Sequence, residues 1–373
     1  MSGTVLHFSD LHLTAGPDRA YSLEVLEEIV SIAQDGSTRA VVIAGDLFDS
    51  FADVEALRAD VRQAFGGLTA PVFFLPGNHE ALRAGVQDLS RFDLSPLRPL
   101  AGKPFELVTL EGDPGYGPAL EILAVPHQLE YGDFRQWNVP EKRTPFRLGV
   151  AHAVVTGLDL WFDQIGTEEE AVAALDPECF VRNQVDYVAL GHIHNAPEAK
   201  TIEGTTLRYG GSARVWRRGE AGPRRVWRLD LSTGESTGIE LSSAGRYHFV
   251  EVPLDLDGAP PDLASVARGW SPRDMVELSL VGVVDDENVV RGARDALRGA
   301  HEGAVRKLVF TPSSQGRGVE VLDGLASEPL AKQFLDRWAA AEPQSNGAER
   351  DTWLRARQLG LVALASHLRK GRR

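Results

Sequence analysis

The stretch YVALGHIHN, residues 187–195, ends an apolar run with two histidines that are separated by a single isoleucine. The apolar run predicts a buried strand, and residues two apart on an extended chain point to the same side. His192 and His194 are therefore expected to face one common object. A metal ion is the obvious candidate, because neutral imidazole is a frequent metal ligand, but the remaining ligands must come from elsewhere in the chain.

The same arrangement recurs through the first 200 residues, where polar side chains follow apolar runs. These side chains are Asp10 and His12 in SDLH, Asp46 and Asp49 in GDLFD, Asn78 and His79 in GNHE, His152 in VAH, and His192 and His194. In open α/β sheets, ligands bind beyond the carboxyl ends of the strands. We therefore expect the five strand ends to converge on one site.

The residue types at these strand ends favour a centre with two metal ions. Imidazole suits manganese, iron and zinc, whereas carboxylate and amide oxygens add hard ligands. Asp46 has two carboxylate oxygens and could bridge two ions, and neutral Asn78 adds no charge that would repel a phosphate. Paired ions activate a water and stabilise both oxygens of an in-line displacement, which is the chemistry of phosphoester hydrolysis.

The alternation of apolar and amphipathic segments predicts an α/β first domain. The expected helices cover 21–33 and 53–65, and the expected strands cover 4–10, 40–46, 71–80 with a turn at its end, 105–110, 119–127, 146–152, 185–192, 205–211 and 224–231. Few helices separate the later strands, which favours a mixed sheet or two packed sheets. The polar break at 242–249 suggests a boundary between a first domain, 1–243, and a small α+β domain, 244–323. Residues 324–373 read as a helical segment.

Composition limits the class of protein. No apolar run approaches the roughly 20 residues that cross a bilayer, the N-terminus has no signal-peptide pattern, and Cys179 is the single cysteine. We therefore expect a cytoplasmic protein without an internal disulfide or a membrane segment. The net charge of −14 argues against a surface that binds nucleic acid throughout, but residues 213–228 hold six arginines and one acid, Glu220.

The ordered series D-x-H, G-D-x-x-D, G-N-H-[DE], H and G-H-x-H resembles the calcineurin-like metallophosphoesterase superfamily over about residues 4–195. The resemblance implies a four-layer α/β sandwich with two divalent ions. It implies one ion held by Asp10, His12, Asp46 and His194, and another held by Asp46, Asn78, His152 and His192. His79 would then act on the phosphate or protonate the leaving oxygen. Asp49 has either a direct role or a role in orienting a ligand.

The stretches HFSDLHL, GDLFDS and YGGS, with the arginine-rich segment and Glu220, resemble the SbcD-type DNA repair exonucleases. The resemblance implies a manganese-dependent DNA nuclease with a capping domain, although zinc, iron or magnesium would also fit the ligands. It also implies a homodimer and a coiled-coil ATPase partner of the structural-maintenance-of-chromosomes type, which contacts the C-terminal helices. The family pattern is altered at Thr14, Glu80, Ala153 and Gly210, none of which is a ligand.

Some side chains and functions remain open from the sequence alone. The arginines Arg214, Arg217, Arg218, Arg224 and Arg225 either contact DNA phosphates or form a solvated hairpin. His7 and Cys179 are expected to pack in the core, and His127, which also follows a strand, either packs there or touches substrate. Two functions compete with a DNA nuclease, namely a phosphoesterase for small diesters or nucleotides and an inactive scaffold for an ATPase.

Overall fold

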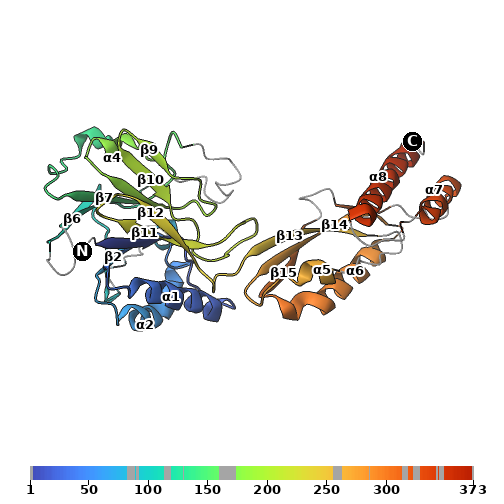
Figure 1. Cartoon of the computed structure of the whole chain (residues 1–373), viewed down its shortest axis with the longest axis horizontal. Coiled ribbons are helices and arrows are strands. Elements are labelled where there is room, and N and C mark those ends of the chain that lie inside the picture. The colour runs from blue at the N-terminus through green and yellow to red at the C-terminus, as the bar shows by residue number, and fades with distance from the viewer. Residues whose placement is uncertain are drawn as a thin grey trace. The chain divides into compact units, whose positions relative to one another are not determined.

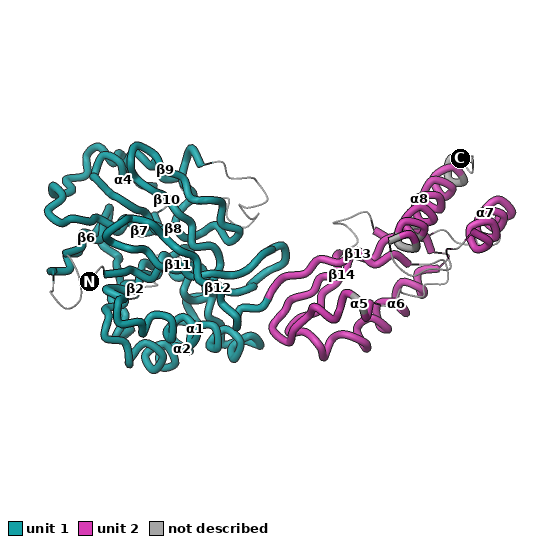
Figure 2. The backbone as a smooth tube through the Cα atoms, viewed as in Figure 1, with its two compact units in different colours: residues 1–245 teal, residues 246–373 magenta. Residues whose placement is uncertain are grey.

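The computed structural model describes residues 3–81, 89, 92–112, 119–128, 130–158, 174–254, 263–284, 286–312, 318–321, 328–341, 343 and 348–371. The chain forms two compact units, Met1–Gly245 and Arg246–Arg373 (Figures 1 and 2). The division lies two residues after the boundary expected from the sequence. The C-terminal helices, which the sequence prediction separated at residue 324, belong to the second unit.

The first unit contains two six-stranded sheets, each of them mixed. In strand order, one sheet consists of β12 (Ser236–Glu240), β11 (Arg225–Asp230), β1 (Thr4–Phe8), β2 (Thr38–Ala44), β3 (Val72–Leu75) and β4 (Leu97–Pro99). The other sheet consists of β5 (Glu106–Leu110), β6 (Leu120–Val125), β7 (Phe146–His152), β8 (Tyr187–Gly191), β10 (Thr205–Tyr209) and β9 (Lys200–Ile202). In the first sheet β1 to β4 pair in parallel, whereas β11 pairs antiparallel with both β1 and β12. In the second sheet β6, β7, β8 and β10 pair in parallel and the edge strands β5 and β9 pair antiparallel, so the mixed α/β architecture predicted from the sequence is confirmed.

Strand β2 shows why both faces of its sheet are buried. Val41 and Ile43 pack in the core beneath helices α1 (Arg19–Ala33) and α2 (Phe51–Phe65), which lie side by side along one face of the sheet (Figure 1). Ala40, Val42 and Ala44 point the other way and pack against the second sheet. Alternate residues of a strand point to opposite faces, so a continuous apolar run is needed where both faces are covered.

The far face of the second sheet carries a third core. This core joins β7 and β8 to the short helix α4 (Glu178–Val181) and to the 3₁₀ turn η2 (Phe134–Gln136). Helices α1 and α2, the first sheet, the second sheet and this outer layer therefore stack in that order. The carboxyl ends of β1, β2, β3, β7 and β8 lie at one edge of this stack. The ion pair between Arg147 and Glu121, 2.7 Å apart, is buried at the start of β7, away from that edge.

The second unit is built on strands that pair in parallel throughout its described part. They are β13 (Tyr247–Leu254), β14 (Met275–Val284), β15 (Lys307–Phe310) and β16 (Val319–Val321), joined by α5 (Ala264–Ala267), α6 (Glu287–His301) and η3 (Glu302–Ala304). Asp286 caps α6 by accepting a hydrogen bond from the Asn288 backbone N–H. Ala293 and Leu297 bury one face of α6 against the sheet.

The C-terminal helices α7 (Pro329–Ala340) and α8 (Ala348–Gly371) pack on this second unit. Leu361 and Ala365 of α8 share a small core with Ala331 of α7 and Val283 of β14. Gln358 also donates a hydrogen bond to the Leu254 carbonyl oxygen. These contacts explain why the helices do not form a separate unit. Within the described ranges, no helix is both long enough and apolar enough to cross a membrane.

Candidate metal centre

The five strand ends singled out in the sequence come together at one edge of the two sheets. Asp10 and Asp46 follow β1 and β2 in one sheet, and His152 and His192 end or follow β7 and β8 in the other. Asn78 and His79 open α3 (Asn78–Ala81), directly after β3. The candidate ligands therefore come from both sheets, and the centre lies where their carboxyl ends meet.

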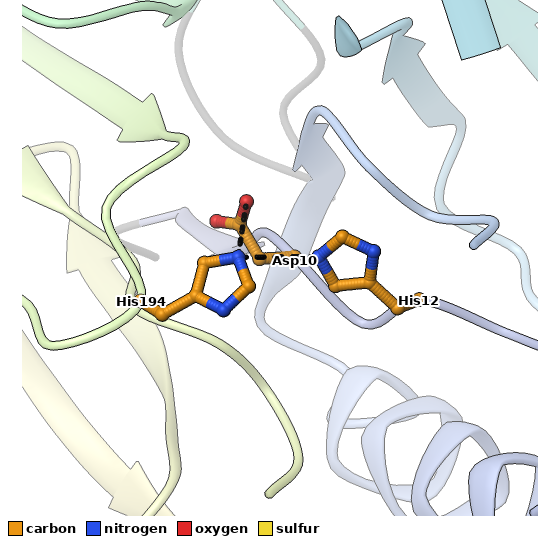
Figure 3. A group of neighbouring side chains, drawn as sticks. All are labelled: Asp10, His12 and His194. Carbon is orange, nitrogen blue, oxygen red and sulfur yellow. Dashed lines mark hydrogen bonds and ion pairs between the residues drawn. The ribbon is translucent and has the colours of Figure 1, made fainter. Parts of the chain in front are cut away.

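Asp10, His12 and His194 form the first cluster of ligand atoms. The Nε2 atoms of His12 and His194 face each other at 3.2 Å, and His194 Nε2 lies 3.6 Å from a carboxylate oxygen of Asp10 (Figure 3). All three side chains are buried, and each offers one ligand atom within 4.8 Å of the others. Two imidazole nitrogens and a carboxylate directed at one another fit a divalent cation.

The second cluster is arranged around His152 and Asn78. His152 Nε2 lies 2.9 Å from the amide oxygen of Asn78 and 3.2 Å from Asp46, while His192 Nδ1 lies 3.2 Å from the same amide oxygen. Asp46 also belongs to ligand groups with Asp10 and with His12. Its carboxylate is therefore within reach of both clusters, as a bridging ligand would be.

The backbone at the candidate ligands is strained. Asp10, His12 and Asp46 have φ values of 53°, 49° and 49°, and His192 has a φ of 98°. Residues other than glycine rarely adopt a positive φ, and each such residue destabilises the folded state by about 1–3 kcal/mol. The Asp10 and His12 amides donate to the carbonyl oxygens of Gly45 and Asp46, so the two loops hold each other in these conformations.

Two glycines allow the ligand loops to approach each other closely. A Cβ atom on Gly77 would lie 2.1 Å from Asp46 Oδ1, and one on Gly191 would lie 1.8 Å from the Ala44 carbonyl oxygen. Neither Cβ atom could be accommodated without moving backbone or the candidate ligand Asp46. Glycine, which has no Cβ atom, therefore lets the backbones come this close at both positions.

Because of burial and neighbouring charges, the candidate histidine ligands differ in protonation state. Burial lowers the pKa values of His12 and His192 well below the usual range, so both imidazoles are neutral and ready to bind an ion. Burial opposes protonation of His152 too, but the Asp46 carboxylate beside it raises the pKa of His152 to about 10. An arriving cation would therefore have to displace a proton from His152.

Glu80 connects two of the ligand loops. Its carboxylate accepts one hydrogen bond from the Phe48 amide at 2.8 Å and another from the Gly77 amide at 2.7 Å, and its side chain is fully buried. Burial, followed by the negative charge of Asp46, raises the pKa of Glu80 to about 8. Glu80 thus ties the loop after β2 to the turn after β3.

His79 and Asp49 lie at the open side of the centre. His79 Nδ1 lies 2.7 Å from the Asp49 carbonyl oxygen, its Nε2 lies 4.0 Å from Asp46, and its side chain is 25% exposed. The Asp49 carboxylate lies 3.6 Å from His12 Nδ1. Asp49 is therefore placed to orient both His12 and His79, one through its side chain and the other through its backbone.

Two residues at the centre were not assigned a site role from the sequence, Glu220 and Trp216. Glu220 Oε1 accepts a hydrogen bond from His194 Nδ1 at 2.6 Å, and Glu220 Oε2 accepts one from the Trp216 amide at 2.7 Å. The Trp216 ring stacks on His12 with a centroid separation of 4.0 Å and an interplanar angle of 6°. The available signal was that Glu220 is the single acid in the arginine-rich segment.

The arginines expected to contact DNA divide into two groups. Arg214 is 1% exposed and donates to the carbonyl oxygens of Leu11 and His12, and Arg224 is 5% exposed and donates to Ser212 and His194. Both guanidinium groups are buried and donate to oxygens within the chain, which leaves little of either available for a phosphate. Arg217, Arg218 and Arg225 retain exposed surface.

Two further histidines are buried outside the ligand clusters. His7 Nε2 lies 2.8 Å from the Tyr187 hydroxyl, and burial lowers the pKa of His7 to about 3. This agrees with the packing role expected for it. His127 is 3% exposed, and burial lowers its pKa to about 4. Cys179 is buried as a free thiol in the outer core.

Comparisons with known proteins agree with this geometry. Residues 3–196 match the family model described as "Calcineurin-like phosphoesterase". The chain is 23% identical over 292 residues to the DNA double-strand break repair protein Mre11 of Thermoplasma acidophilum, covering 74% of this chain and 75% of that protein. It is 29% identical over 268 residues to Mre11 of Haloferax volcanii, covering 68% of this chain and 55% of that protein.

Among solved structures, the yellow lupin purple acid phosphatase PPD1 is 16% identical, with 64% of this chain and 54% of that chain covered and a TM-score of 0.42. A dimetal phosphatase from Danio rerio is 13% identical, with 65% of this chain and 99% of that chain covered and a TM-score of 0.39. The family match spans more than half of the chain and includes all seven candidate metal ligands. The chain therefore belongs to the calcineurin-like phosphoesterase family, whose members are hydrolases with a dinuclear metal site.

Proposed function

We propose that the chain is a two-metal phosphodiesterase that cuts DNA in the repair of double-strand breaks. The observation that carries this proposal is the convergence of two ligand clusters on Asp46, with His79 at their open side. The similarity to the two Mre11 proteins supports DNA as the substrate. One of these alignments covers 292 residues and so extends beyond the matched phosphoesterase region, 3–196.

In the proposed reaction, the chain's own residues position the phosphate and move a proton. When bound, two divalent ions, which we take to be manganese, would supply Lewis-acid activation of water and neutralise charge on the phosphate. The Nδ1–H of His79 donates to the Asp49 carbonyl, which leaves Nε2 directed toward the centre. A protonated Nε2 can donate to a phosphate oxygen or to the leaving oxygen. Neutral Asn78 adds a ligand without repelling the substrate.

DNA contacts are proposed on both units. On the first unit, Arg217, Arg218 and Arg225 retain exposed surface and can contact phosphates. On the second unit, a cavity of about 530 Å³ is lined by Ser279 of β14 and by two acids, Glu287 and Asp295, together with three arginines of α6. They are Arg291, Arg294 and Arg298. The lining has a small excess of positive charge, which supports the proposal that the second unit contacts DNA.

The same proposal includes a partner surface on the C-terminal helices. Leu330 of α7 is 51% exposed and Leu359 of α8 is 65% exposed, whereas Trp338 and Trp353 pack edge to face against each other. We propose that this apolar surface binds the coiled-coil ATPase, and that the protein works as a homodimer in the cytoplasm. Exposed apolar side chains on paired helices are a common way to recognise a partner.

A small diester or nucleotide is the second candidate substrate. The net charge of −14 favours it, because an acidic protein gains little from long-range attraction to a polyanion. The two candidates differ in their response to salt. Cleavage of DNA should weaken steeply as salt rises, since phosphate contacts release counterions, whereas turnover of a small diester should change little.

The deciding experiment incubates the purified chain and manganese with an end-labelled DNA duplex and, separately, with an aryl phosphodiester. His79→Ala and His194→Ala test the centre, and His301→Ala, at the end of α6, serves as the matched histidine control. Loss of DNA cleavage in both centre variants but not in the control supports the proposal. Cleavage of only the aryl diester, lost in His194→Ala, would instead support the small-molecule function.

A further inference from the structure

One short segment contacts both imidazoles of the first ligand cluster. Residues 214–220, which we name the clamp segment, follow β10 and the residues Gly210–Ala213. Glu220 accepts a hydrogen bond from His194 Nδ1 at 2.6 Å, and the Trp216 indole stacks on His12 at 4.0 Å. The two side chains thus hold the two rings whose Nε2 atoms face each other at 3.2 Å.

The clamp segment is itself fixed in place by buried polar contacts. Both oxygens of Glu220 are used, because Oε2 accepts from the Trp216 amide at 2.7 Å. Arg214 donates from Nε to the Leu11 carbonyl oxygen at 2.7 Å and from Nη2 to the His12 carbonyl oxygen. Backbone and ring of His12 are therefore held by the same segment that orients His194.

The second cluster is held by different parts of the chain. His152 Nδ1 lies 2.9 Å from the Ala44 carbonyl oxygen, at the end of a core strand, and His152 Nε2 faces Asn78. Asn78 belongs to the turn that Glu80 ties to Phe48. These supports lie in the β2, β3 and β7 strand ends and not in the clamp segment.

We propose that Trp216 and Glu220 are positioning residues that set the affinity of one ion site, formed by Asp10, His12 and His194. The inference rests on the two-ion part of the proposed function. A carboxylate that accepts the Nδ1–H of a ligating histidine fixes its tautomer, aims its Nε2 lone pair and raises its basicity. Removal of such a partner weakens metal binding by on the order of 10–100-fold. The parallel stack on Trp216 restrains the orientation of the His12 ring.

The test measures manganese bound to the full chain and does not depend on activity. Glu220→Gln keeps the size of the side chain but replaces one acceptor oxygen with an amide NH₂, and Trp216→Phe shortens the stacking surface. Matched controls are Glu235→Gln, on the exposed turn between β11 and β12, and Trp270→Phe, in the second unit. Isothermal titration gives the number of tight ions, and electron paramagnetic resonance distinguishes a spin-coupled manganese pair from a single ion.

The wild-type chain and both controls are expected to bind two tight ions and show the coupled signal. Glu220→Gln and Trp216→Phe are expected to retain one tight ion, with the second weakened by on the order of 10–100-fold. Double variants identify which ion is affected. Glu220→Gln added to His194→Ala should cause little further loss, whereas Glu220→Gln added to His152→Ala should leave no tight ion.

Three results would overturn the inference. Two tight ions with unchanged affinities in both clamp variants would show that the segment does not set ion affinity. Loss of both ions in Glu220→Gln alone would show that the two sites are not supported separately. A reversed pattern in the double variants would place the effect on the other ion. A wild-type chain that binds fewer than two ions would reject the two-ion function itself, and failure to cut DNA would leave the ion measurements unaffected.

Discussion

His79 Nδ1 lies 2.7 Å from the backbone carbonyl oxygen of Asp49, an arrangement that holds the imidazole through one nitrogen and directs the other at the centre. The carbonyl can only accept a hydrogen bond, so Nδ1 carries the hydrogen and Nε2 carries the lone pair in the neutral ring. The contact does not depend on the Asp49 side chain. A substitution of Asp49 that preserves the loop should therefore leave the His79 tautomer unchanged.

His79→Ala is expected to lower kcat by about 10²–10⁴-fold, the usual contribution of a general acid. Both manganese ions should remain bound, because Asp46 and the other candidate ligands are untouched. Steady-state kinetics on an aryl phosphodiester, with metal titration of the same sample, checks both parts. If His79→Ala binds one ion fewer, His79 is a ligand, which its place in a cluster with His12 and Asp46 would allow.

The pKa of His152, raised to about 10 by Asp46 against the opposing effect of burial, predicts how pH affects stability without metal. A histidine with a raised folded-state pKa contributes stability that is fully present below its unfolded value, near 6.5, and lost as pH rises toward 10. The ion-free chain should therefore lose stability over this range. Thermal unfolding in a chelator at several pH values measures the loss, and His152→Gln should reduce it.

Metal binding should release a proton from the same residue. The enthalpy of manganese binding at pH 7.5 should depend on the ionisation enthalpy of the buffer, because the buffer takes up the displaced proton. His152→Gln should bind manganese with a smaller buffer dependence. An identical dependence in the variant and the wild type would mean that the proton comes from another group, of which His194 is the first candidate, since Glu220 raises its pKa against the effect of burial.

The two groups of arginines should respond differently in DNA-binding measurements. Alanine in place of Arg217, Arg218 or Arg225 should reduce the slope of log K against log salt by about 1 for each phosphate that the arginine binds. Arg214→Lys should leave the slope unchanged but lower stability, because lysine cannot reproduce the paired hydrogen bonds to Leu11 and His12. Fluorescence anisotropy across a salt series, with thermal unfolding of each variant, separates the two effects. A reduced slope in Arg214→Lys would contradict its structural role.

Gly191→Ala should disrupt both the fold and the centre. Its Cβ atom would lie 1.8 Å from the Ala44 carbonyl oxygen, so the two sheets would have to separate at the point where the ligands meet. Overpacking of this kind typically costs about 1–3 kcal/mol or more, and the variant should also bind manganese weakly. Gly36→Ala is the matched control, because nothing lies within 4 Å of the added atom. Equal stability of the two variants would refute the steric argument.

The strand-end residues could be predicted from the sequence because two local signals coincide there. An apolar run such as YVALG predicts a buried strand, and aspartate or histidine directly after it has no packing reason to be there. The parallel pairing of β7 with β8, and of β1 with β2, then brings the ends together. The order of the motifs along the chain further indicated that these strand ends form one centre.

The supporting contacts could not be predicted because they depend on tertiary placement. Glu220 and His194 are 26 residues apart, and nothing local shows that one accepts a hydrogen bond from the other. Arginines in a polar, glycine-containing segment are expected at the surface, yet Arg214 and Arg224 are buried against backbone oxygens. The left-handed backbone of Asp10, His12 and Asp46 has no sequence signal either, since these residues do not favour it as glycine does.

The position of Gly191 against Ala44 has a consequence for how this protein can diverge. Ala44 lies in the core between the sheets, and its carbonyl oxygen also faces His152 Nδ1, so the ligand framework and the sheet packing cannot change independently. Arg217 and Arg218, by contrast, lie on a partly exposed loop outside the strands, where substitution disturbs little of the core. Evolutionary drift in substrate preference should therefore accumulate in that loop, while ancestral and descendant enzymes keep the same hydrolytic chemistry.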